Sequence, residues 1–370
     1  MKELASKNGY KDQCSLCGKV SGEVIHTSSS KFIKTIKGLL RYYYSESEYH
    51  SKLGGESFSY HLSGENPILK FSNKFNKLEK EDFLLSFLEE LEQDKDILLY
   101  TAYGRDIYNY PPMTAVSVGK SSILGEIKSK LIKLNYYQVE DEFESRLASI
   151  ATHIETKLNL GECYYRARIG SVLKASNFDW RRMMHEEEFH VPYQGDEIAA
   201  PPIHLATGGR INRPGVSYLY LATDSATAIS EVRPHPGENV SVGKFKANRK
   251  LKIADFSQHT LTDELLSDDG LDTLELIIAI ENNLSMAVSP SMSKHYSVTQ
   301  FIAEIVRKQG FDGLSFKSSV SEGKNYVIFN PEMFDWVDNS GEVFKINAVS
   351  YSSQNQLLFN PEEDYDLIRD

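Results

Sequence analysis

The chain has 370 residues, which is enough for two domains that each bury a hydrophobic core. Its hydrophobic fraction of 41% and charged fraction of 25% are those of a soluble globular protein. The formal net charge of −11 argues against a protein that wraps nucleic acid or binds an anionic membrane with its whole surface. A local basic pocket is compatible with that charge.

No targeting or membrane-spanning segment is expected from the sequence. The apolar runs are short, residues 276–280 being typical, and the first residues have no apolar signal core. Three cysteines do not make a disulfide scaffold, so a reducing cytoplasm is the expected location.

Cys14 and Cys17 form a CxxC motif near the start of the chain. A tetrahedral zinc site needs four ligands and no second CxxC follows, so His26, His50 or His61 would have to complete it. The alternative is a pair of reduced thiols in an N-terminal turn. The sequence leaves both interpretations open.

Apolar residues then recur at helical spacing. The longest stripe runs from Val139 to Leu158 and keeps its phase for about five helical turns. Three shorter stripes precede it, at residues 33–43, 83–91 and 123–134. Residues 1–159 are therefore predicted to form a helical N-terminal domain.

Arg146 and His153 stand seven positions apart on the longest predicted helix, which places them on nearly one face. An Arg–His pair at this spacing resembles the pair of the RNA-cleaving helical family called HEPN. That resemblance implies RNA cleavage by the N-terminal domain. The alternative is two solvated or packing side chains, because such spacings arise often by chance.

From about residue 160 the pattern changes to short strands and tight turns. Residues 162–169 alternate as in a strand and place Arg166 and Arg168 on one side. Further amphipathic helices are predicted at 273–284 and 297–308. The expected organisation is a second domain of mixed strands and helices over 160–345 and an acidic tail over 346–370.

Residues 201–236 carry the features with the most chemical content. After a Gly-Gly-Arg turn, a buried strand is predicted over 216–222, and a polar residue at 223–225 can cap the helix that follows. Glu231 falls in the last turn of that helix, where the helix dipole favours a cation over a carboxylate. We therefore expect Glu231 to have a role other than helix stability.

The second half combines arginines at glycine turns, several tyrosines, one helix-end glutamate and late serines. An arginine beside a glycine can form bidentate hydrogen bonds to phosphate oxygens, and a tyrosine ring can stack on a heterocycle. A lone carboxylate suits the cation that develops as a glycosidic bond breaks. This inventory is compatible with cleavage of an N-glycosidic bond in a dinucleotide. The alternative is a structural ion-pair network of Arg166, Arg210 and Glu231.

The order of the motifs resembles the RES domain family, which is named for an Arg, a Glu and a Ser. The resemblance covers about 163–335 and rests on YYRAR, GGRINRPG, LYLA, ISEV and FKSS. It implies an ADP-ribosyltransferase-like fold and an enzyme that degrades NAD, often as the toxin of a toxin–antitoxin pair. An antitoxin or regulatory protein is the implied partner, and neither membrane nor nucleic acid is expected.

Carried over by position, the resemblance implies four catalytic residues: Arg166, Tyr220, Glu231 and Ser318. Ser319 is the alternative for the serine. Glu231 would stabilise the cationic ribosyl centre, Tyr220 would stack on or orient the nicotinamide ribose, and Ser318 would orient Glu231 or the substrate.

The resemblance also implies a substrate-binding turn at Gly209, Arg210, Asn212 and Gly215. Arg210 would hold the pyrophosphate of NAD together with Arg166. Ile211 stands where compact members of the family often have an aromatic residue, a departure that bears on the base pocket.

The predicted protein is therefore α+β, with a HEPN-like helical N-terminal domain followed by an ADP-ribosyltransferase-like mixed-sheet RES domain. The implied activity is that of an NAD glycohydrolase or NAD phosphorylase that needs no metal for bond cleavage. Three alternatives stay open: a mono-ADP-ribosyltransferase, a HEPN-type RNA-cleaving enzyme and a protein that senses a nucleotide without turnover.

Overall fold

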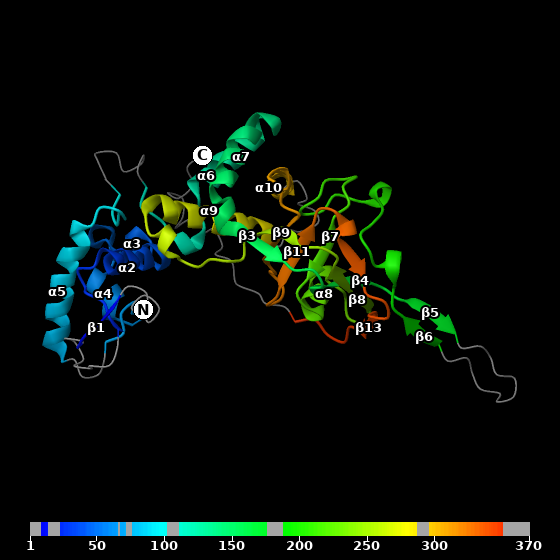
Figure 1. The fold of residues 1–370 in the computed structure, drawn as a ribbon, viewed down its shortest axis with the longest axis horizontal. Coiled ribbons are helices and arrows are strands. Elements are labelled where there is room, and N and C mark those ends of the chain that lie inside the picture. Colours follow the sequence, from blue (N-terminus) through cyan, green and yellow to red (C-terminus); the bar gives the residue numbers. More distant parts are fainter. Residues whose placement is uncertain are drawn as a thin grey trace, which may run out of the picture.

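The computed structural model describes residues 9–13, 23–65, 67–71, 76–101, 111–175, 188–286 and 296–350. Within these ranges the protein is α+β, with a helical N-terminal part followed by a large mixed sheet, as predicted (Figure 1). Cys14 and Cys17 lie outside the described residues. Among the described helices, none combines the length and apolarity that crossing a membrane requires.

Within the described ranges, the N-terminal part consists of helices and one short hairpin. The helices are α2 (Ser30–Tyr43), α3 (Glu46–Tyr49), α4 (Phe58–Ser63), α5 (Lys77–Gln93), α6 (Ser122–Lys133) and α7 (Tyr137–Ile154), and the hairpin is β1 (Tyr10–Lys11) with β2 (Glu23–Val24). A capping box between Asn76 and Glu79 starts α5. Helices α2 and α5 bury their apolar faces against each other, with the rings of Phe32 and Phe87 5.2 Å apart between centroids.

The second part is built on one sheet. Its strands are β3 (Glu155–Leu158), β4 (Cys163–Ile169), β7 (Leu219–Ala222), β8 (Asn239–Ala247), β9 (Leu251–Asp255), β10 (Gly313–Lys317), β11 (Lys324–Ile328), β12 (Phe334–Trp336) and β13 (Glu342–Lys345). Their order is β12-β8-β4-β7-β11-β10-β9-β3, and β13 also pairs with β8. A separate hairpin of β5 (Val172–Ala175) and β6 (Glu188–Val191) projects from one end of the molecule (Figure 1).

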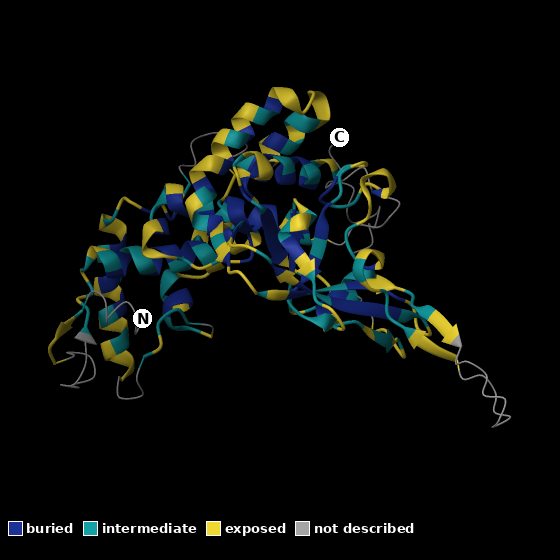
Figure 2. Cartoon of the chain, turned by 45° about the vertical axis from the view of Figure 1, so that its right-hand side comes forward, coloured by how far each residue is buried: buried dark blue, intermediate teal, exposed yellow. Residues whose placement is uncertain are grey.

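Three α-helices complete the described portion of this part: α8 (Ser225–Val232), α9 (Asp268–Ser285) and α10 (Tyr296–Lys308). The described ladders are antiparallel except the one between β9 and β10, which is parallel. A parallel pair needs a long crossover, and α9 with α10 provides it. Strands β7, β8, β9, β10 and β11 are mostly buried, and dark blue ribbons mark this part of the sheet in Figure 2.

Alternation along the strands divides the core between the two sheet faces. On β7, Leu219 and Leu221 belong to the cluster on one face, whereas Tyr220 packs against the cluster on the other. That second cluster also contains the inward residues of α6, α7, α9 and α10. Helix α8 contacts β4, β7 and β8 and buries Ala228 with Ala222 on the same face as Tyr220. This face therefore carries α8 beside the larger group of helices.

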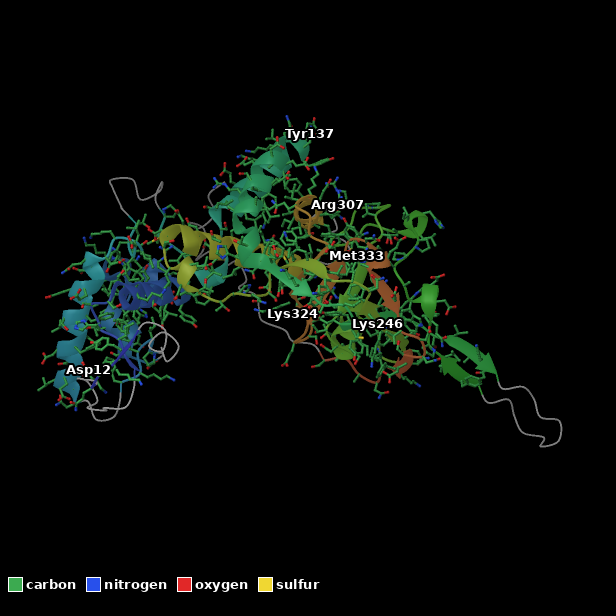
Figure 3. The ribbon with its side chains drawn as sticks, viewed as in Figure 1. Asp12, Tyr137, Lys246, Arg307, Lys324 and Met333 are labelled. Carbon is green, nitrogen blue, oxygen red and sulfur yellow. The ribbon has the colours of Figure 1, made fainter. Side chains whose placement is uncertain are left out.

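Helix α7 and strand β3 precede the predicted boundary at residue 160 but pack on the sheet. Phe143 of α7 stacks on Phe301 of α10 at 5.5 Å between ring centroids, and β3 pairs with β9 from Glu155 to Leu158. Figure 3 labels Tyr137, where α7 begins. The division into 1–159, 160–345 and 346–370 thus remains a proposal about independent folding, and α7 with β3 shares the core of the second unit.

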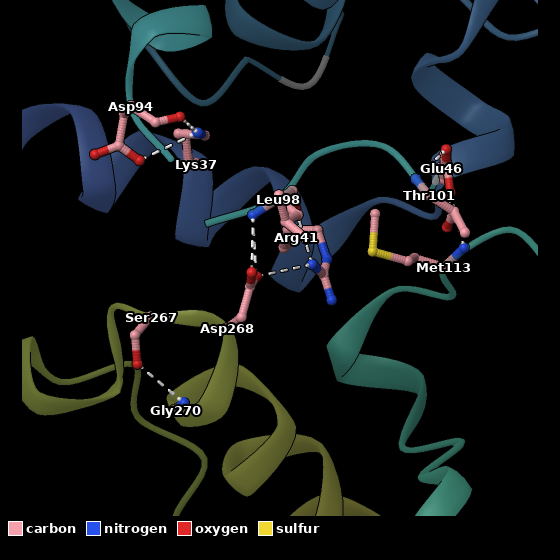
Figure 4. Close-up of polar contacts among 10 residues, drawn as sticks. All are labelled: Lys37, Arg41, Glu46, Asp94, Leu98, Thr101, Met113, Ser267, Asp268 and Gly270. Carbon is pink, nitrogen blue, oxygen red and sulfur yellow. Dashed lines mark hydrogen bonds and ion pairs between the residues drawn. The ribbon is translucent and has the colours of Figure 1, made fainter. Parts of the chain in front are cut away.

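Helix α9 joins the N-terminal helices to the sheet. At its first residue, the Asp268 carboxylate accepts a hydrogen bond from the backbone N–H of Leu98 (3.0 Å) and lies 3.5 Å from Nη1 of Arg41 (Figure 4). The Ser267 hydroxyl caps the same helix end by accepting from the Gly270 N–H. The other end of α9 reaches the candidate site described below.

Candidate functional site

A pocket of about 440 Å³ lies on the sheet face that carries α8 and α10, and it is lined by residues of β4, β7, α8, β10, β11 and the first residue of α10. This volume is within the range of roughly 300–1,000 Å³ that is usual for small-molecule sites. Four of the predicted site residues line it: Arg166, Arg210, Tyr220 and Glu231. The fold therefore brings these residues together from separate parts of the chain.

Glu231 lies in the last turn of α8, as predicted from the sequence. Its Oε1 atom accepts two hydrogen bonds of 2.7 Å, one from the Ser318 hydroxyl and one from Nδ2 of Asn325. Its Oε2 atom has no hydrogen-bond partner within the described ranges. Two donors on one oxygen fix the plane of the carboxylate and leave the other oxygen for a ligand. Ser319, the alternative serine, is exposed.

Arg166 lies where the sheet begins to split. Strands β4 and β7 share one bridge, between Tyr165 and Ala222. Beyond it, Nη1 of Arg166 donates to the Tyr220 carbonyl (3.0 Å) and Nε donates to the Ile198 carbonyl (2.6 Å). The guanidinium thus satisfies a backbone acceptor that faces the gap beside β4. Burial lowers the pKa of Arg166 to about 10, so the group still carries its positive charge at neutral pH.

Tyr220 and Asn212 stabilise the glycine turn through hydrogen bonds. The Tyr220 hydroxyl donates to Oδ1 of Asn212 (2.7 Å), and burial raises the pKa of Tyr220, so the phenol stays protonated. Nδ2 of Asn212 donates to the carbonyls of Thr207 and Val216, each at 2.9 Å. A Cβ on Gly209 would lie 2.7 Å from Oδ1 of Asn212, so a larger residue there would displace the Asn212 side chain.

Asn212, Gly209 and Gly215 do not line the pocket, although the sequence placed them in the substrate-binding turn. The physical reason is that the Asn212 amide group already forms hydrogen bonds within the turn. Gly215 has a left-handed backbone (φ 79°) at the point where the turn ends. Their contribution is to shape the loop that presents Arg210. Nη1 of Arg210 donates to the carbonyl of Leu284 (3.0 Å) in the last turn of α9, where the helix dipole favours a cation.

Asn325 and Arg233 line the pocket with polar side chains that the sequence prediction did not name. Asn325 is buried on β11, 94 positions from Glu231, and its amide faces the pocket rather than solvent. A polar residue on the inward side of an apolar strand was the available clue. Figure 3 labels Lys324, which precedes Asn325 at the start of β11. Arg233 ends α8 with a left-handed backbone (φ 50°, ψ 56°) and lines the pocket two residues after Glu231.

The other predicted sites are not brought into this pocket. Within the described ranges there is no group of three or more His, Cys, Asp or Glu side chains that could hold a metal ion. The predicted zinc ligands Cys14 and Cys17 fall outside those ranges. Arg146 and His153 lie on α7, Arg146 exposed and His153 half-buried, and neither lines the pocket around Glu231.

Comparison with known families matches residues 180–347 to the RES domain. The matched segment contains the glycine turn, Tyr220, Glu231 and Ser318, whereas Arg166 and the N-terminal helices precede it. Among solved structures, the chain is similar to a chain in "Crystal structure of the M.tuberculosis MbcT-MbcA toxin-antitoxin complex", with 10% sequence identity and a TM-score of 0.31. That alignment covers 55% of this chain and 92% of the other. A comparison with curated proteins gives no match.

Proposed function

We propose that this pocket cleaves the bond between nicotinamide and ribose in NAD, as an NAD glycohydrolase or NAD phosphorylase. The observation that carries the proposal is the Glu231 carboxylate, held through one oxygen by Ser318 and Asn325 and open at the other. The match of residues 180–347 to the RES domain supports the same conclusion. A likeness in fold to ADP-ribosyltransferases is part of this proposal.

The proposed step is dissociative. As the glycosidic bond breaks, its electron pair moves to the nicotinamide nitrogen, so the pyridinium leaves as neutral nicotinamide and needs no proton from a general acid. Positive charge develops on the anomeric carbon and ring oxygen of the ribose. The Oε2 atom of Glu231 faces that charge, which a preorganised carboxylate stabilises more in the transition state than in the bound substrate. Water or phosphate then bonds to the anomeric carbon and loses a proton to solvent.

The two arginines that the sequence predicted would hold the pyrophosphate. Arg166 uses Nε and Nη1 on backbone carbonyls and has Nη2 available, and Arg210 uses Nη1 on the Leu284 carbonyl. Both therefore approach the substrate from fixed positions, which limits the entropy lost on binding. Tyr220 would offer its ring to the nicotinamide ribose, because its hydroxyl proton is already donated to Asn212.

Loss of NAD would make the protein a toxin or defence effector in the cytoplasm, and its host would then need an antitoxin or another regulatory protein to keep it inactive. No metal enters the proposed step, since the leaving group and the carboxylate account for the charge.

The test is incubation of the purified protein with NAD labelled in the adenosine part, with and without inorganic phosphate, followed by product identification. A glycohydrolase gives free nicotinamide and ADP-ribose in both conditions. A phosphorylase gives ADP-ribose phosphorylated at the anomeric carbon, and only when phosphate is present. Label on protein or nucleic acid would identify a macromolecular acceptor instead, and NAD that stays intact under every condition would contradict the proposal.

A further inference from the structure

Arg233 is the arginine of this pocket that the predicted site does not use. It lies at the C-terminal cap of α8, where its backbone is left-handed (φ 50°, ψ 56°). Glycine is the residue that usually ends a helix in this conformation, because a side chain there crowds the backbone. Within the described ranges, Asn339 is the other non-glycine residue with positive φ. A long cationic side chain is therefore kept at a position that helix termination alone would give to glycine.

The guanidinium of Arg233 differs in its contacts from those of the other two arginines. Arg166 and Arg210 each donate to backbone carbonyls, so part of their hydrogen-bonding capacity is used by the fold. Arg233 is exposed, and the described part of the chain offers its guanidinium neither a hydrogen bond nor an ion pair, not even with Glu231 two positions earlier. It thus presents an unused planar set of donors, which is suited to phosphate oxygens.

Arg233 also stands at the junction of two hollows. It lines the pocket around Glu231, and it lines a second groove of about 590 Å³ with the outer face of α8 and residues 346–350. Neutral side chains make up the rest of that groove apart from His235. Arg233 is therefore the lining residue that the two hollows share.

We propose that Arg233 is a further anion-binding residue of this site and holds a phosphate group at the mouth of the pocket. The inference rests on the proposed NAD cleavage. Two molecules carry such a phosphate group: the substrate, in its pyrophosphate, and a free phosphate that accepts the ribosyl group. Both are anions that a guanidinium binds with paired hydrogen bonds.

The Arg233→Gly variant tests this without endangering the fold, because glycine adopts the left-handed backbone more readily than arginine. Asn339→Gly relieves the same backbone conformation away from the pocket, and Arg249→Gly removes an exposed arginine from the turn before β9; both serve as matched controls. Binding of ADP-ribose is measured by calorimetry for all four proteins, and NAD turnover is measured with and without inorganic phosphate.

For a pyrophosphate contact, Arg233→Gly should raise the Kd for ADP-ribose and the KM for NAD by about tenfold or more, the KM being measured with phosphate if the parent requires it. For an acceptor contact, both values should stay at the parent level while the acceleration by inorganic phosphate is lost. Parent values for ADP-ribose binding and phosphate response in Arg233→Gly would overturn the inference. If the parent protein leaves NAD intact, the proposed function fails, and binding of ADP-ribose alone tests the inference. A tenfold weaker binding by Arg233→Gly supports Arg233 as an anion-binding residue. Equal binding by parent and variant, or no binding by the parent, overturns the inference.

Discussion

The amide of Asn325 is expected to contribute to catalysis by fixing the Glu231 carboxylate. It donates a 2.7 Å hydrogen bond to Oε1, the oxygen that also accepts from Ser318. A single hydrogen bond would leave the carboxylate free to rotate about its Cγ–Cδ bond, whereas two donors hold its plane, Ser318 just after β10 and Asn325 on β11. A hydrogen bond to a charged group contributes about 1.5–3 kcal/mol. Asn325→Ala should therefore lower kcat by about tenfold to a hundredfold, because 1.4 kcal/mol corresponds to a factor of ten.

The assay is steady-state release of nicotinamide by the parent, Asn325→Ala, Ser318→Ala and the double variant. Both donors serve one oxygen, so the double variant should lose less than the product of the two single losses. Asn248→Ala is the matched control, since Asn248 donates to the Asp335 carboxylate (3.0 Å) away from the pocket. A parent-like kcat for Asn325→Ala, in protein that melts as the parent does, would refute the positioning role.

Arg166→Ala should raise the KM for NAD more than it lowers kcat. It should also lower the melting temperature, because two backbone carbonyls lose their donor. Equal losses of kcat and kcat/KM would contradict a mainly binding role. A fragment of residues 160–350 should melt below one of residues 121–350, since it lacks α7 and β3 from the shared core; equal melting temperatures would show that the second unit folds from residue 160. Metal analysis tests the CxxC motif: a site predicts about one zinc per chain, lost on Cys14→Ser with Cys17→Ser, and free thiols predict none.

The position of Glu231 could be predicted because the clue was local. A polar cap, apolar residues at helical spacing and a glutamate in an unfavourable last turn are all read within one short segment, and the structure has that helix over Ser225–Val232. The same holds for the helical N-terminal part, whose long apolar stripe became α7 as far as Ile154. The stripe was wrong at its end, because Glu155–Leu158 form strand β3, which pairs with β9. Local periodicity was sufficient to predict both of these helices.

The contacts of the site depend on strand order, which the sequence does not encode locally. Asn325 reaches Glu231 because β11 pairs with β7 and α8 crosses the same face. Arg166 was expected to hold the pyrophosphate, and nothing in the sequence indicated that its Nε and Nη1 also bind carbonyls where the ladder between β4 and β7 ends after one bridge. Packing of α7 on α10 likewise joins segments that no short pattern relates.

The measurement that tests the central claim most directly compares NAD turnover and NAD affinity for the parent and Glu231→Gln. The glutamine oxygen can accept from Ser318 and Asn325 as Oε1 does, so the fold and the bound substrate should be retained while the negative charge is lost. Removing one preorganised electrostatic partner costs on the order of a hundredfold to a thousandfold in rate. The account predicts a loss of that size in kcat with NAD affinity close to that of the parent. Cleavage of NAD by Glu231→Gln at the parent rate would contradict it.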